Sequence, residues 1–379
     1  MNNKIIILVA IATIFGLLSG VVGQIVSRAY FLEKDFNMPL FGDISFGDDN
    51  NSANLIISNP KKIVVEQETK AVETAQAVSG GIMGIFLKED LEDKYINLRE
   101  KDGQAFVITS DGWMVSTFIP KEILQIKDKD ATSSREKILK VIKNYIFISS
   151  DFKNYEVENV LYDSLSGFSF WKIKAYDLPV RKLEGFLNNG ELVFGVNWAG
   201  DILVTTILGK EEETKVLSSD IFMEEILVSD KIDPKLNNSF LFNVYGDLLG
   251  FIKEDSKIIA IKSFNSLIKN LLKNKSIKRP SLGVNYINYF NVLDLEKNKT
   301  RLGAKISKDE KDIAIFKKSP AEISGLKEGD IIMAINKINL TKDTNLRELI
   351  NNYLPGDELI IDYLREDKSF SVNLKLDSF

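Results

Sequence analysis

Short apolar runs separated by turn signals fill the middle of the chain and restrict its fold more than any other feature. The runs predicted as strands are Ile82–Leu87, Gln104–Thr109, Trp113–Phe118, Val141–Ser149, Phe168–Ile173, Leu192–Asn197, Ile202–Leu208, Phe240–Val244 and Leu248–Ile252. Many short strands with few long helical patterns favour a β-sandwich or a pair of barrels. A lone helix is predicted from Ser263 to Asn274, because apolar side chains recur there every three or four residues. We therefore expect a mainly β region over residues 67–278 that ends in a linking helix.

The remainder, residues 279–379, is predicted as a separate small α+β domain. Ser319 opens a short helix that Gly325 closes, and Asn345 caps a second helix. Three strands are predicted around these helices: Ile331–Ile335, Glu358–Leu364 and Phe370–Leu376.

The N-terminus carries an apolar run, Ile5 to Gly23, without a charged residue. Its length is close to the roughly 20 residues that cross a bilayer. We predict an uncleaved transmembrane anchor over residues 5–26, with residues 1–4 cytoplasmic by the positive-inside tendency. A flexible linker is expected over residues 27–66, which are rich in Gly, Asp, Asn and Ser. These features predict a single-pass protein of the cell membrane whose bulk is extracytoplasmic.

The chain contains no histidine and no cysteine. Without imidazole, no side chain has an unperturbed pKa suited to proton transfer near neutral pH. Without either residue, a metal site would need oxygen ligands, and no calcium-type loop is present. We expect neither a metal site nor a cofactor. The net charge of −5 gives no indication of a nucleic-acid partner.

Three motifs of the C-terminal domain resemble a bacterial PDZ domain. The run Ser319 to Asn336 is similar to its core motif, the run from Leu346 to Asp357 to its groove helix and exit turn, and Arg279–Val284 to its carboxylate-binding loop. In such loops backbone N–H groups face the terminal carboxylate of a peptide that adds as a strand to the sheet. The resemblance implies peptide binding by Ser281, Leu282, Gly283, Val284, Leu346, Leu349 and Ile350.

The β region that precedes this domain resembles the trypsin-like protease module of the HtrA/Deg family. Gly103–Pro120 is similar to the strand pair that carries the catalytic histidine, Gly167–Ile173 to the segment of the aspartate, and Asp233–Gly250 to the nucleophile loop. The three triad positions then fall on Ile119 (or Phe118, with a one-residue slip), Gly167 and Asn237. None of these side chains can act as base, orienting carboxylate or nucleophile, and Lys235 and Asn238 replace glycines of the oxyanion-hole loop.

Together these patterns predict a trypsin-like double β-barrel followed by a PDZ domain, with an N-terminal transmembrane helix and no catalytic residues. The implied protein is a pseudoprotease scaffold or regulator in envelope protein quality control. Its PDZ groove would bind unfolded polypeptides or protein C-termini. The family resemblance also implies that the chain assembles into a homo- or hetero-trimer. Two alternatives remain: an endopeptidase with a rearranged site, such as a Ser239–Lys dyad, and a purely structural envelope protein with an empty groove.

Overall fold

The structure is a computed structural model of the 379-residue chain. It describes residues 16, 19–20, 36–38, 42–45, 56–58, 67–88, 96–126, 131–211, 216–291, 293–294, 299–300, 302–342 and 344–378. The chain divides into two compact units, residues 1–67 and 68–379.

The first unit contains a small antiparallel sheet within the segment predicted as a linker. Its strands are β1 (Phe36–Met38), β2 (Gly42–Ser45) and β3 (Ile56–Ser58), in that order. The predicted anchor, residues 5–26, lies outside the described residues except for Gly16, Ser19 and Gly20. None of the helices in the described ranges is long and apolar enough to cross a membrane.

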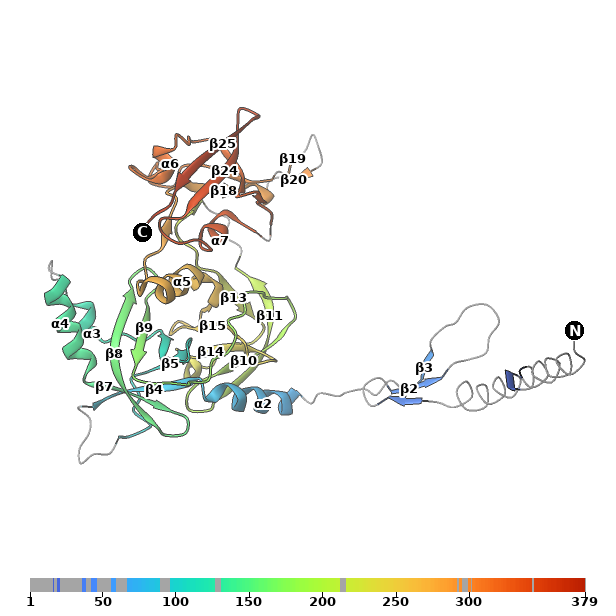
Figure 1. The fold of residues 1–379 in the computed structure, drawn as a ribbon, viewed down its shortest axis with the longest axis vertical. Coiled ribbons are helices and arrows are strands. Elements are labelled where there is room, and N and C mark those ends of the chain that lie inside the picture. The colour runs from blue at the N-terminus through green and yellow to red at the C-terminus, as the bar shows by residue number, and fades with distance from the viewer. Residues whose placement is uncertain are drawn as a thin grey trace, which may run out of the picture. The chain divides into compact units, whose positions relative to one another are not determined.

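Two closed six-stranded barrels form the β region and confirm the predicted double barrel (Figure 1). The first contains, in spatial order, β4 (Ile82–Leu87), β5 (Gly103–Val107), β6 (Trp113–Ser116), β9 (Phe168–Ile173), β8 (Asn154–Asp163) and β7 (Tyr145–Ser149). The second contains β10 (Leu192–Val196), β11 (Ile202–Lys210), β13 (Glu225–Val228), β16 (Ile258–Ala260), β15 (Leu248–Ile252) and β14 (Phe240–Asn243).

Several elements depart from the sequence prediction. The run Val141–Ser149 is not one strand, because its first two residues end a helix, α4 (Ala131–Ile142), and only the remainder forms β7. Two further helices were not predicted, α2 (Gln67–Ser79) and α3 (Lys121–Leu124). Strands β8, β13 and β16 were also missed. Much of β8 alternates between exposed and half-buried side chains, so it lacks the apolar run that marks the central strands.

The largest part of the core lies where the two barrels meet. Phe106 of β5 packs against Phe240 and Phe242 of β14, with ring centroids 5.5 and 5.3 Å apart. The predicted linking helix is confirmed as α5 (Asn265–Asn274), preceded by a 3-10 turn, Ile261–Phe264. Leu267 and Leu271 of α5 belong to the same core cluster as these phenylalanines. The helix therefore packs against the core between the two barrels and also connects them to the C-terminal domain.

The C-terminal domain is built on one sheet with the strand order β12-β18-β21-β22-β24-β25, to which β23 adds beside β22. These strands are β12 (Leu217–Ser218), β18 (Asn285–Asn288), β21 (Ala304–Ile306), β22 (Ile331–Ile335), β23 (Ile338–Asn339), β24 (Glu358–Arg365) and β25 (Lys368–Lys375). Its short helices are α6 (Pro320–Ile323) and α7 (Leu346–Ile350), capped by Ser319 and Asn345 as predicted. Smaller pairings join β17 (Pro280–Ser281) to β26 (Asp377–Ser378) and β19 (Leu293–Asp294) to β20 (Lys299–Thr300). The edge strand β12 comes from the second barrel's β11–β13 connection and not from the C-terminal domain itself.

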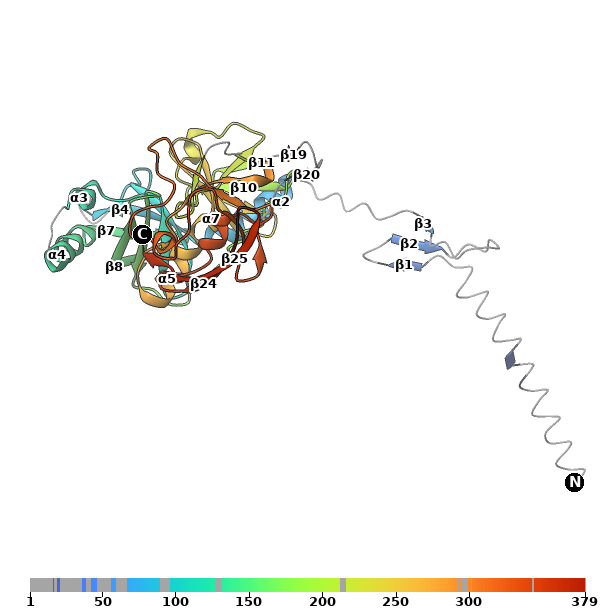
Figure 2. The ribbon, with the colours of Figure 1, turned by 90° about the horizontal axis from the view of Figure 1, so that it is seen from above.

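Buried charges join the second barrel to the C-terminal domain. Figure 2 shows the ribbon of the C-terminal domain from above. Lys262 is 7% exposed by side chain and lies 3.0 Å from both Glu224 and Glu348. Burial by itself would lower the pKa of Lys262, but the two carboxylates outweigh it and raise that pKa. Beside it, Ser266 Oγ of α5 donates to Asn351 Oδ1 at 2.7 Å. A second buried pair joins Arg279 to Asp163 of β8 at 2.7 Å.

We predict that Lys262→Met destabilises the folded chain by about 3 kcal/mol, because it leaves the buried carboxylate of Glu224 with only the partly exposed Lys210 as its ion-pair partner. Urea unfolding of the full chain, followed by tryptophan fluorescence, measures this change. Lys257→Met is the matched control, because Lys257 is 51% exposed and pairs with Glu225 at the surface; we expect less than about 1 kcal/mol. Equal losses in the two variants would contradict a special role for Lys262.

The sign of the pH dependence follows from the raised pKa of Lys262. The contribution of Lys262 to the free energy of unfolding is fully present below the ordinary lysine pKa of about 10.4. It is lost as the pH rises through the pKa that Lys262 has in the folded chain.

Candidate functional site

The three segments predicted to carry a triad lie next to one another. Ser169 Oγ of β9 donates to the carbonyl oxygen of Phe118 at 2.5 Å, so the segment after Gly167 contacts the segment before Ile119. Thr117 Oγ1 donates to Asn238 Oδ1 at 2.9 Å, which brings the Ile119 segment to the Asn237 loop. The two barrels thus hold these loops together as a trypsin-like fold would.

The residues at the three predicted triad positions make structural contacts and do not contact one another through hydrogen bonds in the described part of the chain. Ile119 packs against the core of the first barrel beside Phe118, whose ring stacks on Trp171 at 6.3 Å. Gly167 has no side chain and adopts a positive φ of 77° in the β8–β9 turn. Asn237 Nδ2 donates to the carbonyl oxygen of Glu254 at 2.7 Å and Asn237 Oδ1 accepts from Ser256 Oγ at 3.3 Å. No proton relay joins the three residues among the described hydrogen bonds.

The backbone of the Asn237 loop is also satisfied internally. In a serine protease the oxyanion hole uses the N–H of the nucleophile and the N–H two residues before it. Here the N–H of Asn237 donates to the Pro234 carbonyl at 3.1 Å. The N–H of Lys235 donates to Asp233 Oδ1 at 2.9 Å. The donors that would stabilise an oxyanion therefore point at the loop's own acceptors.

Asn238 retains the left-handed conformation that a glycine would supply, with φ of 61°. Asparagine adopts this region more readily than most residues, so the loop keeps its path without glycine. The hydroxyl of the neighbouring Ser239 is fully buried and donates to the Leu236 carbonyl at 2.5 Å. No lysine lies within hydrogen-bond distance of Ser239 in the described part of the chain, so the alternative Ser–Lys dyad is not assembled. The described residues likewise contain no cluster of acidic side chains suited to a metal.

Gln104 of β5 holds the Asn237 loop in place from the first barrel. Its Nε2 donates to the Asn238 carbonyl at 2.7 Å, and its Oε1 accepts from the Trp198 N–H at 2.8 Å. Only 1% of Gln104 is exposed. One buried amide thus connects β5 to two turns of the second barrel.

We predict that Gln104→Leu costs about 2–4 kcal/mol of unfolding free energy, because it leaves the carbonyl of half-buried Asn238 and the N–H of half-buried Trp198 without their partner. Differential scanning calorimetry of the full chain would measure the loss. Gln125→Leu, at an exposed position after α3, is the control and should have little effect. Equal melting temperatures for the two variants would contradict the bridging role.

The residues predicted to bind a peptide gather at one edge of the C-terminal sheet. Leu282, Val284, Leu346, Leu349 and Ile350 are buried in a single apolar cluster with Leu217 of β12. Gly283 adopts a positive φ of 85°, and a Cβ there would lie 2.2 Å from the Ser319 Cβ. Only glycine fits this turn, because its φ is positive and a Cβ would clash with Ser319.

The loop predicted to bind a peptide carboxylate already holds the side-chain carboxylate of Asp220. Asp220 Oδ1 accepts from the N–H groups of Leu282 and Gly283 at 2.8 and 3.0 Å, and Ser281 Oγ donates to Asp220 Oδ2 at 2.6 Å. The Val284 N–H donates to Ser219 Oγ at 3.1 Å. Sequence reasoning missed Ser219 and Asp220, because a short polar stretch between two strands carries no signal of its own.

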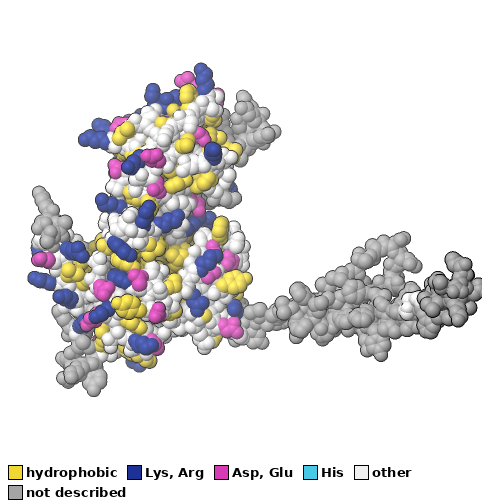
Figure 3. Space-filling model, in the orientation of Figure 1, with side chains coloured by type: hydrophobic (Ala, Val, Ile, Leu, Met, Phe, Trp, Pro, Cys, Tyr) yellow, Lys and Arg dark blue, Asp and Glu magenta, His cyan; other side chains and the backbone are white. Residues whose placement is uncertain are grey.

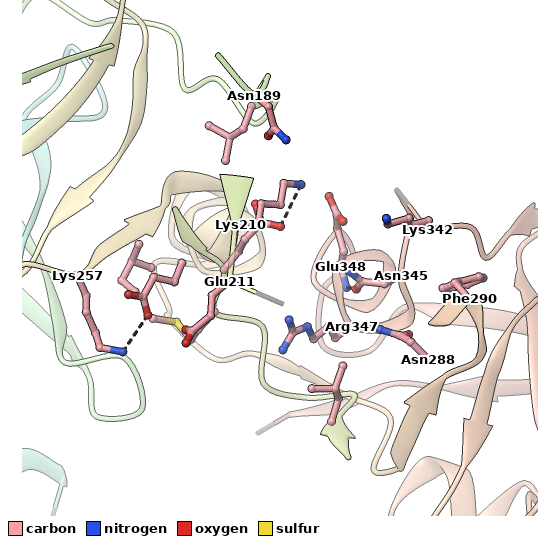
Figure 4. Close-up of a pocket in the computed structure, with 16 residues that line it drawn as sticks. Asn189, Lys210, Glu211, Lys257, Asn288, Phe290, Lys342, Asn345, Arg347 and Glu348 are labelled. Atoms are coloured by element: carbon pink, nitrogen blue, oxygen red, sulfur yellow. Dashed lines mark hydrogen bonds and ion pairs between the residues drawn. The ribbon is translucent and has the colours of Figure 1, made fainter. Parts of the chain in front are cut away.

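A cleft of about 580 Å³ opens between the second barrel and the C-terminal domain. Figure 4 shows Lys210 and Glu211 on the barrel side facing Arg347 and Glu348 on the side of α7. Leu217 also lines the cleft. The cleft is thus polar, with both signs of charge, and it reaches the first residue of β12.

The family model described as PDZ domain matches residues 300–376. A probable periplasmic serine endoprotease, DegP-like, from Marinomonas sp. (strain MWYL1) is 24% identical over 294 residues, which cover 74% of this chain and 58% of that protein. Serine protease Do-like HtrB of Bacillus subtilis (strain 168) is 26% identical over 52% of this chain and 48% of that protein. Serine protease Do-like HtrA of Lactococcus lactis subsp. cremoris (strain MG1363) is 24% identical over 38% of this chain and 39% of that protein.

The match therefore spans between 39% and 58% of the length of these curated relatives. Among solved structures, the HtrA-type protease AlgW with a tripeptide superposes with a TM-score of 0.54 at 14% identity, over 81% of this chain and 97% of that chain. That likeness concerns the fold, a mainly β trypsin-like pair of barrels with a PDZ domain. The chain is a homologue of the HtrA/DegP-family serine proteases with a C-terminal PDZ domain.

Proposed function

We propose that this protein is a pseudoprotease, which keeps the trypsin-like barrels as a scaffold and binds polypeptide C-termini through its PDZ domain. The observation that carries the proposal is the loop at Asn237, where the N–H groups of both Lys235 and Asn237 donate within the loop. The absence of histidine from the whole chain supports it independently. A site without base, nucleophile or free oxyanion donors has none of the parts that acyl transfer requires.

The peptide-binding half of the proposal is supported by the loop Ser281–Val284. Its N–H groups converge on one carboxylate, which is the chemistry that recognises a free C-terminus. The family model at residues 300–376 and the strand added at the sheet edge point the same way. The ligand class we propose is therefore unfolded polypeptides or protein C-termini.

The proposal extends to location and assembly. The apolar run at residues 5–26 supports a single membrane anchor with the barrels and the PDZ domain extracytoplasmic. The relationship to HtrA/DegP proteases supports a homo- or hetero-trimer in which this chain regulates envelope protein quality control.

Figure 3 shows Lys and Arg among Asp and Glu on the face in view. The formal net charge of −5 gives no electrostatic reason to propose a nucleic-acid partner.

A fluorophosphonate probe tests the loss of catalysis directly. We expect no labelling of the full chain and no cleavage of casein, because Ser239 is buried and its hydroxyl donates to a carbonyl. A catalytically active HtrA-type protease, assayed in parallel, is the positive control. Labelling that disappears in Ser239→Ala would establish the rival function, an endopeptidase with a rearranged site.

Restoring the three side chains tests whether the backbone is also unfit. We predict that the triple variant Ile119→His, Gly167→Asp, Asn237→Ser stays at least about 100-fold below the active relative in kcat, because loss of an oxyanion donor alone costs that much. Casein cleavage under single-turnover conditions measures it. Activity equal to that of the relative would contradict the assignment of the Lys235 and Asn237 N–H groups.

A further inference from the structure

The segment Leu217–Asp220 occupies the place of a peptide ligand in the PDZ groove. Leu217 lies opposite Tyr286 and Ser218 opposite Asn285, in an antiparallel register. The Ser219 N–H then donates to the Val284 carbonyl at 2.9 Å. A bound peptide adds to a PDZ sheet in this way, with its last residue at the carboxylate-binding loop.

We propose that Leu217–Asp220 is a built-in ligand of the groove, and that a free C-terminus binds only after this segment is displaced. The inference rests on the proposed peptide binding and names its regulation. The side-chain carboxylate of Asp220 takes the position of the terminal carboxylate, and Ser219 takes that of the final residue.

The carboxylate of Asp220 makes the hydrogen bonds that the terminal carboxylate of a peptide ligand would make. Its carboxylate is 8% exposed and accepts from two backbone N–H groups and the hydroxyls of Ser219 and Ser281. No lysine or arginine forms an ion pair with Asp220 in the described residues. Hydrogen bonds from neutral donors to a charged carboxylate are strong, and they are the same bonds a peptide terminus would make. The two carboxylates therefore compete for one set of donors.

Phe222, two residues after Asp220, lines a small recess next to the predicted carboxylate-binding loop. Phe222 is buried and lies with Asp220 and Ile350 around one small recess, where the guanidinium of Arg347 is 5.5 Å from its ring. A peptide could not place an apolar last side chain there while Phe222 remains. Displacement of residues 217–220 would also move Phe222, which clears the loop and the recess together.

Tethering explains why an external peptide competes poorly with the segment. A ligand on the same chain acts at an effective concentration of about millimolar or higher. Apparent affinity for an external peptide falls in proportion to the fraction of open groove. The upstream part of a displacing peptide would follow β12 away from the loop, toward the cleft that Leu217 lines.

The test uses a peptide copied from the internal ligand. The probe is a fluorescein-labelled peptide ending in Val216-Leu-Ser-Ser219 with a free carboxylate, and its C-terminal amide is the ligand control. Fluorescence anisotropy with the full chain gives the affinity. We expect Asp220→Asn to bind the free-acid peptide at least about tenfold more tightly than the unaltered chain, because loss of the charge weakens the internal competitor. Asp177→Asn, at an exposed position in the first barrel, should bind as the unaltered chain does.

A reversible lock makes the same test without removing Asp220. Ser218→Cys with Asn285→Cys places two cysteines at directly opposed positions, and the chain has no other cysteine. Binding of the free-acid peptide should be lost in the oxidised form and return on reduction. Circular dichroism checks that each variant is folded. If Asp220→Asn does not fold, the oxidised and reduced forms of the double-cysteine variant still test the proposal.

The outcomes separate the two proposals. If the unaltered chain binds the free-acid peptide, and neither Asp220→Asn nor the oxidised lock alters that affinity, the built-in ligand is overturned while peptide binding stands. If folded Asp220→Asn and the reduced lock bind neither form of the peptide, peptide binding itself fails and this inference fails with it. Equal binding of the acid and the amide would overturn the role of the carboxylate.

Discussion

One connection of the second barrel, residues 217–224, carries two buried carboxylates that join this barrel to the C-terminal domain. At one end Asp220 satisfies the N–H groups of Leu282 and Gly283, and at the other Glu224 pairs with Lys262, which also holds Glu348 of α7. Both groups of contacts are buried, so each charge needs its partner to offset desolvation. The barrels and the PDZ domain are therefore held by a few polar contacts that could not be lost singly without cost.

Under the proposed function, the protein keeps a trypsin-like framework while the residues at the proposed triad positions make structural contacts. Phe118 and Ile119 pack on the first barrel, and Asn237 binds the β15–β16 turn. Gln104 then fixes the loop from the opposite barrel.

Much of this could be predicted from the sequence, and the reasons for the rest are physical. The short strands, the linking helix and the caps Ser319 and Asn345 follow from periodicity and turn chemistry, which are local. Periodicity left a β-sandwich and a barrel pair both open, and the family resemblance implied the double barrel. Helix α4 and strand β8 were missed because their exposed faces are charged and dilute the apolar pattern. Asp220 could not be found at all, since its partners lie more than sixty residues away in the sequence and only the fold brings them together.

Hydrogen exchange at Leu282 and Gly283 tests the central claim most directly, because their N–H groups report whether the groove is occupied without any added peptide. In the ligand-free full chain we expect these two amides to be strongly protected, and we expect Asp220→Asn to lose that protection while the amides of β22 keep theirs. Exchange of Leu282 and Gly283 at the rate of an exposed loop in the unaltered chain would contradict the account.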